Sequence, residues 1–112
     1  MLFCLTAEYT AQALNAMREN ANTNRQAAVE KLVEAAGGKL VSIYARASNG
    51  PGVMVIFDVP DPQMSAAMTG VAVASGAVHN VQLTRLYTMA EMSEIREKRV
   101  RLSAAYKPPG QA

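Results

Sequence analysis

The sequence predicts a single α+β domain, and three observations lead to this class. Its 112 residues match the length of one domain. Hydrophobic residues make up 50% of the chain, which is enough for a core without a disulfide or a metal. Short apolar or alternating segments, typical of strands, are interspersed with segments that have helical spacing.

The N-terminal segment predicts a strand followed by an interrupted helix. Residues 2–6 are short and apolar, as in a strand buried on both faces. Helical spacing begins near Thr10. The Asn-rich segment Asn20–Asn24 predicts a break, because asparagine side chains compete for backbone hydrogen bonds.

A second helix is expected after this break. Thr23 and Gln26 have the spacing of a capping box, in which each side chain bonds the other residue's backbone amide. The helix runs to Ala36, and Gly37-Gly38 ends it because glycine adopts the left-handed C-terminal conformation at little cost.

The middle of the chain predicts a hairpin. Residues 39–47 and 53–59 form its strands, and Ser48-Asn49-Gly50-Pro51-Gly52 forms the turn. Alternation places two sets of side chains on opposite faces of the first strand. One set is Leu40, Ser42, Tyr44 and Arg46, and the other is Val41, Ile43 and Ala45.

The C-terminal part predicts a helix, a strand and a final helix. Asp61 and Pro62 suit the N-cap and first position of a helix that stops at Gly76. A strand follows over about residues 78–87. Thr88 and Glu91 form a second capping box, and the helix they open runs to about Ala105.

The element order is βαββαβ plus one helix, which predicts a ferredoxin-like arrangement over residues 1–107 and a loose tail over 108–112. Right-handed crossovers place both main helices on one face of the sheet. The other face still carries large side chains, namely Leu40, Tyr44, Met54, Ile56 and Leu86. We therefore expect a second copy to cover it, giving a homodimeric α+β barrel or a higher oligomer.

Several strings in the chain resemble the GYD-domain family. They are Tyr9-Thr10, Asn24-Arg25, Gly37-Gly38-Lys39, Tyr44, Val53 to Asp61 and Val81 to Thr88. The resemblance covers about residues 1–95 and implies a small dimeric α+β-barrel protein with no settled activity. The family's Gly-Tyr-Asp string is expected between the two middle strands, where this chain has Ser48 to Gly52. No role of that string is therefore transferred.

Composition excludes several classes of function. Cys4 is the single cysteine and His79 the single histidine, so neither an internal disulfide nor a zinc site is expected, and no cofactor is indicated. No apolar run approaches a membrane span, and the start lacks a signal-peptide pattern, so we expect a cytoplasmic protein.

The net charge of +2 is too small to indicate nucleic-acid binding. Residues 94–112 carry five basic and two acidic residues, as on a solvated helix.

The candidate binding residues are polar side chains expected on the uncovered sheet face. They are Ser42, Tyr44, Arg46, Gln82 and Thr84, with Thr6, Asp58 and Asn80 as further polar neighbours. A register shifted by one residue would instead present Arg85 and Tyr87. Apolar walls with a few polar groups are typical of small-molecule pockets. The alternative is that these groups satisfy each other across the dimer.

His79 is the candidate catalytic residue. Its imidazole could act as a general base, with Tyr44 or Arg46 holding an oxyanion. The alternative is a surface histidine at the start of a strand. The sequence thus predicts a homodimer that binds a small apolar ligand with a polar end. Two other hypotheses remain. One is a cofactor-independent isomerase or monooxygenase, and the other is a structural assembly module.

Overall fold

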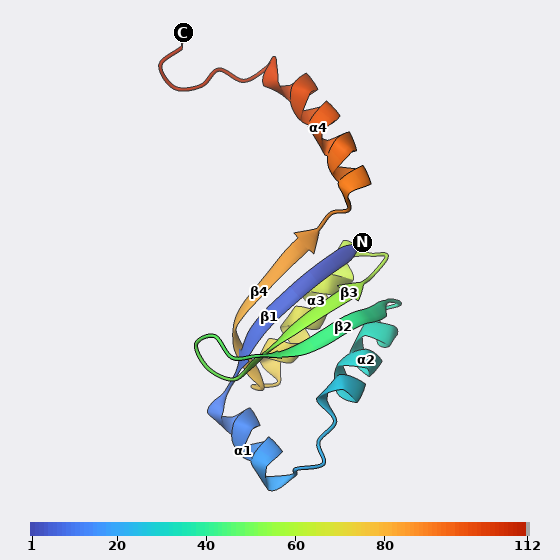
Figure 1. Ribbon diagram of the computed structural model, residues 1–112, viewed down its shortest axis with the longest axis vertical. Helices are drawn as coiled ribbons and strands as arrows, with labels where there is room; N and C mark the ends of the chain where they lie inside the picture. The colour runs from blue at the N-terminus through green and yellow to red at the C-terminus, as the bar shows by residue number, and fades with distance from the viewer. Residues whose placement is uncertain (112) are drawn as a thin grey trace.

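The computed structural model describes residues 1–111, and the last residue of the expected tail, Ala112, lies outside them. An antiparallel sheet of four strands is combined with four helices (Figure 1). In chain order the elements are β1 (Leu2–Tyr9), α1 (Ala11–Glu19), α2 (Arg25–Ala35), β2 (Lys39–Arg46), β3 (Gly52–Asp58), α3 (Pro62–Ala74), β4 (Val78–Leu86) and α4 (Met89–Ser103).

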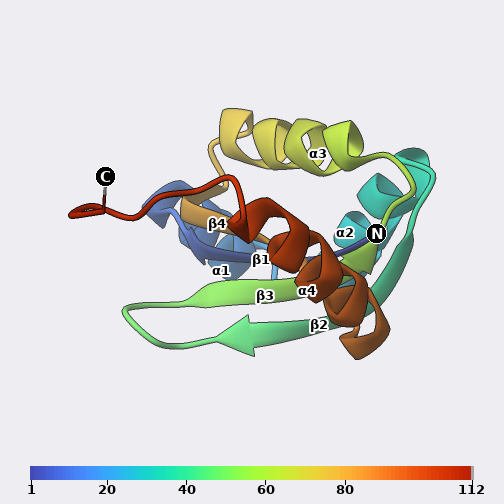
Figure 2. The ribbon, with the colours of Figure 1, turned by 90° about the horizontal axis from the view of Figure 1, so that it is seen from above.

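The strands lie in the order β2-β3-β1-β4. This order and connectivity are consistent with the expected ferredoxin-like arrangement. Helices α2 and α3 lie on the same side of the sheet, α2 over β2 and α3 over β4 (Figure 2). The opposite side carries no helix within residues 1–111 and is called the open face below.

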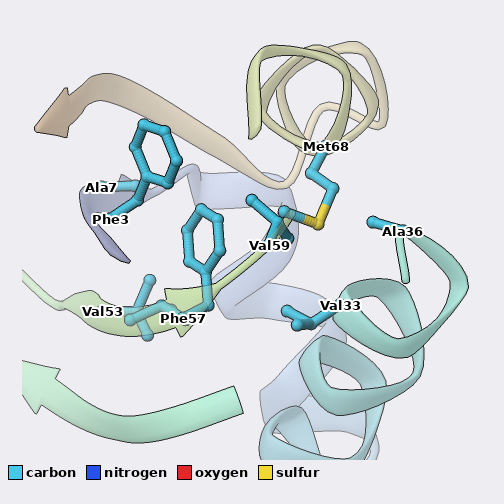
Figure 3. Close-up of a cluster of buried hydrophobic side chains, with 9 residues drawn as sticks. Phe3, Ala7, Val33, Ala36, Val53, Phe57, Val59 and Met68 are labelled. Atoms are coloured by element: carbon cyan, nitrogen blue, oxygen red, sulfur yellow. The ribbon is translucent and has the colours of Figure 1, made fainter. Parts of the chain in front are cut away.

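The core lies between the sheet and these two helices. Phe3 of β1 and Phe57 of β3 are paired across the sheet with ring centroids 5.7 Å apart. Val33 of α2 and Met68 of α3 extend from their helices toward the strand residues (Figure 3). The remaining buried hydrophobic residues are Ala7, Ala36, Val53, Val55 and Val59.

The predicted break between the first two helices is confirmed, but its cap differs from the prediction. The side chain of Asn24 accepts from the backbone N–H of Ala27 at 3.0 Å, so Asn24 is the N-cap of α2. The hydroxyl of Thr23 donates to the carbonyl of Asn20 instead. Asparagine competes well with threonine for this position, so the capping box with Gln26 was wrong.

Leu40 does not lie on the open face as predicted. The pairing of β2 with β3 shifts between Leu40 and Ser42, which places Leu40 opposite the core residue Phe57. The irregularity leaves Val41 exposed and returns Ser42, Tyr44 and Arg46 to the open face. One inserted residue therefore reverses the alternation at the start of β2.

Helix α4 extends from the end of β4 away from the rest of the chain (Figure 1). Its capping box forms as predicted between Thr88 and Glu91. No residue of α4 is buried, and the side chain of Leu102 is 71% exposed. The helix gives the chain an elongated shape of 63 × 32 × 22 Å. Within residues 1–111, no helix has the length and apolarity needed to cross a membrane.

Candidate functional site

The strand pairing sorts the open face into rows that run across all four strands. One row contains Ser42, Ile56, Cys4 and Thr84, and the next contains Tyr44, Met54, Thr6 and Gln82. These rows place four of the predicted binding residues on one face, in the register the sequence predicted. Arg85, from the alternative register, lies opposite Phe3 on the covered face and stacks on its ring.

The predicted binding residues do not converge within one chain. Ser42 and Tyr44 lie on β2, whereas Gln82 and Thr84 lie on β4, and these are the two outer strands. Three strand spacings separate them, or roughly 14 Å. Tyr44 is 57% exposed, which leaves its side chain available to a ligand or partner.

A third row gathers the charged groups at one end of the open face. It contains Arg46 of β2, Gly52 of β3, Glu8 of β1 and His79 of β4. Glu8 is the centre of this polar row, and its side chain is only 15% exposed. Its Oε1 lies 3.6 Å from a terminal nitrogen of Arg46, and its Oε2 lies 3.6 Å from Nε2 of His79.

Gly52 allows Arg46 to reach Glu8. The two residues are separated by β3, where Gly52 is the residue between them and carries no side chain. A Cβ at Gly52 would overlap the backbone carbonyl oxygen of Ala7. Strands β1 and β3 therefore approach closely here. The Arg46 side chain passes over Gly52, where any residue with a side chain would leave it less space. Its Nε is buried and has no hydrogen-bond partner within residues 1–111.

A bulge brings two residues of β4 to the same carboxylate. The pairing of β1 with β4 shifts between Thr6 and Glu8, and Asn80 has a φ of 49°. Asn80 donates to Oε2 of Glu8 at 3.0 Å, the same oxygen that faces His79. Bulges often redirect side chains in this way. Here the result is a carboxylate surrounded by an amide, an imidazole and a guanidinium.

Glu8 is the residue that sequence reasoning missed. The first strand was expected to end at Thr6, but it continues to Tyr9. Alternation from Leu2 through Cys4 and Thr6 continues to Glu8, so the two-residue period contained the signal. His79 is half exposed beside this carboxylate, an arrangement suited to proton transfer.

The described residues also carry reactive groups outside the polar row. Within residues 1–111, no group of three His, Cys, Asp or Glu residues has the geometry to hold a metal ion. Cys4 is partly exposed on the open face, between Ile56 and Thr84, although the strand over residues 2–6 was expected to be buried on both faces. Asp58, another predicted polar neighbour, binds the N-terminal amine at 2.8 Å.

The fold and the open face define a small α+β domain whose sheet is covered by helices on one side only. The chain matches the family model of the GYD domain over residues 3–95, and it belongs to this family. A comparison with curated proteins finds no match.

Proposed function

We propose that this GYD-domain protein is a homodimer that binds a small, mostly apolar ligand with a polar or anionic end between its two open faces. The apolar residues Leu2, Cys4, Met54, Ile56 and Leu86 support the dimer, because they share a face that no helix of the described part of the chain covers. Such a face is typical of an isologous interface.

The separation of the predicted binding residues carries the proposal of a shared site. A two-fold axis parallel to the strands would place β2 of one copy over β4 of the other, because it reverses the strand order and keeps the rows aligned. Tyr44 would then face Gln82 of the second copy, and Ser42 would face its Thr84. Two equivalent binding sites would form at the edges of the interface, each completed by both copies.

The polar row supports an anionic end on the ligand. In the same arrangement, Arg46 of one copy would face His79 of the other, with Glu8 fixing both side chains from the sheet. Arginine offers several donors to a carboxylate or enolate, and tyrosine adds one more. The Glu8 and His79 pair also supports the alternative of an isomerase activity, in which His79 transfers the proton.

Light scattering of the full chain tests the dimer. We expect a mass of about twice the 12.0 kDa chain at micromolar concentration. Ile56→Lys should give a monomer, because it places an unpaired charge in the interface. Gln26→Lys, on an exposed position of α2, is the matched control and should remain a dimer. A monomeric wild type would contradict the proposal.

Subunit complementation tests the shared site, with benzoate as a compact anionic probe. Tyr44→Phe, Arg46→Ala and Gln82→Ala should each weaken benzoate binding, by about tenfold for Arg46. A heterodimer of Tyr44→Phe and Gln82→Ala chains should regain one wild-type site per dimer, because both substitutions fall in the other site. Equal weakening of both sites in the heterodimer would show that each site belongs to one chain. His79→Ala should leave benzoate affinity within about twofold, since its expected role is turnover.

A further inference from the structure

A cavity of about 450 Å³ lies on the covered side of the sheet, opposite the proposed dimer interface. Helix α2 packs over β2 and α3 over β4, so the two helices cover the outer strands and leave a gap above β1 and β3. The cavity is lined by Val29 and Leu32 of α2, Met68 and Val71 of α3, and Leu5 and Val55 of the sheet. Its volume falls within the roughly 300–1,000 Å³ of small-molecule pockets.

Small side chains lie in the cavity lining on both helices. Ala28 of α2 and Ala72 of α3 are the two helical alanines in it. Helix α3 carries no charged residue along its length. The wall of the cavity therefore offers apolar contacts and no carboxylate, which suits an alkyl chain or another apolar body.

A smaller cavity of about 210 Å³ adjoins this chamber at the end nearest α1. Both cavities share Tyr9, Arg25, Ser75 and Ala77 in their linings. The smaller one adds Gln12 and Thr23, so its character is more polar. Together the two form a pocket with an apolar chamber and a polar end, and Arg25 stands where they meet.

Among the described residues, Arg25 is the single charged one in either lining. Within residues 1–111 it forms no ion pair and no side-chain hydrogen bond, unlike Arg46 and Arg85, which each face a glutamate. It is also the first residue of α2, where the helix dipole disfavours a cation. Neither a partner within the fold nor the stability of the helix accounts for its charge, which is complementary to an anionic group in the pocket.

We infer that this pocket binds an alkyl monocarboxylate, with the alkyl chain between α2 and α3 and the carboxylate at Arg25. The site is distinct from the one proposed on the open face, and it lies within a single chain. It therefore does not depend on dimerisation.

Calorimetric titration of the full chain with decanoate, and with 1-decanol as its uncharged counterpart, tests the inference. Arg25→Gln should weaken decanoate binding about tenfold and leave decanol binding within twofold, because it removes one charge-assisted contact. Arg18→Gln, on an exposed position of α1 outside both linings, is the matched control and should change neither. Ala28→Trp should weaken both ligands at least tenfold by filling the chamber.

The monomeric Ile56→Lys variant separates this site from the dimer interface. This monomer lacks the shared open-face sites, so decanoate should still bind it at the pocket, and adding Arg25→Gln in this background should weaken that binding about tenfold. Failure of the wild type to bind decanoate would overturn the inference, as would equal weakening of decanoate and decanol by Arg25→Gln. Loss of decanoate binding in Arg46→Ala with Arg25→Gln unaffected would place the ligand on the open face instead. Thermal melts of each variant establish that the fold is intact.

Discussion

The two faces of the sheet differ in how apolar and charged side chains are distributed along the strands. The covered face is apolar through its centre, where Phe3, Val55 and Phe57 are buried beneath the helices. The open face changes along the strands, from Leu2 and Leu86 at one end to Glu8 and its charged neighbours at the other. Packing within one chain explains the first pattern. It does not explain why the apolar end of the second pattern stays uncovered, which the proposed dimer would account for.

Two adjacent residues of β3 give the sharpest test of this difference. Phe57 is 2% exposed on the covered face, and Phe57→Ala should lower the free energy of unfolding by about 3–5 kcal/mol. Ile56 points the other way and is only partly buried in one chain. Ile56→Ala should cost less, and its cost should depend on protein concentration if the side chain is buried in the proposed dimer. Denaturant unfolding at two concentrations checks both, and a concentration-independent loss for Ile56 would show that the open face is not an interface.

Gly52 affects both the polar row and the packing of the sheet, because it lies in that row and its backbone packs closely against β1. Gly52→Ala should destabilise the fold by about 1–3 kcal/mol, since its Cβ would overlap the carbonyl of Ala7. Gly70→Ala in α3 is the matched control, because a Cβ there meets nothing within 4 Å. That control should be neutral or stabilising by up to about 1 kcal/mol. Equal effects of the two substitutions in thermal unfolding would contradict the close approach.

Asn24 begins the helix that covers β2, so its loss should loosen the covered face alone. Asn24→Ala should cost about 1 kcal/mol, because the backbone N–H of Ala27 loses its acceptor. Thr23→Ala should cost less than half of that, since its hydroxyl bonds only the exposed carbonyl of Asn20. Thermal unfolding of both variants measures the difference. The reverse order would restore Thr23 as the cap.

The smallest expected effect concerns Glu91, which links α4 to the covered side through Arg85 at 3.1 Å. The backbone N–H of Thr88 holds the pKa of the Glu91 carboxyl below its usual value, and Arg85 adds to the shift. Because the folded pKa is lowered, this contribution is present above the ordinary pKa of glutamate and is lost as the pH falls through the lowered one. The Thr88 amide resonance should report this transition in an NMR titration. It should disappear in Glu91→Gln and persist in the control Glu94→Gln.

The sequence predicted the elements well where local chemistry decides them. Asp61 with Pro62, and Thr88 with Glu91, begin α3 and α4 as expected, because a cap depends on a few consecutive residues. The left-handed φ of Gly37 and Gly76 confirms both predicted helix ends. These signals need no knowledge of the rest of the chain.

The candidate site was predicted less completely, because it depends on pairing between strands. The open-face position of Tyr44 and Gln82 follows from alternation, but their separation follows from the strand order. The contact of Glu8 with Asn80 arises from a bulge that no sequence pattern in β4 predicts. The cavity at Arg25 was not predicted at all, since it results from the spacing of two helices. Irregularities and gaps of this kind arise between elements rather than within them.

The isolation of α4 has a consequence for how the chain melts. An autonomous helix of its 15 residues is close to the minimum length that is stable in water, roughly 12–15 residues. The sequence places glutamates four residues before a cation, at Glu94 and Lys98 and at Glu97 and Arg101, and each such pair, where it forms, adds about 0.2–0.5 kcal/mol to an isolated helix. Added salt screens such exposed pairs but leaves the buried core intact. We therefore expect ionic strength to affect α4 separately from the sheet, so that no single melting temperature would describe both parts of the chain.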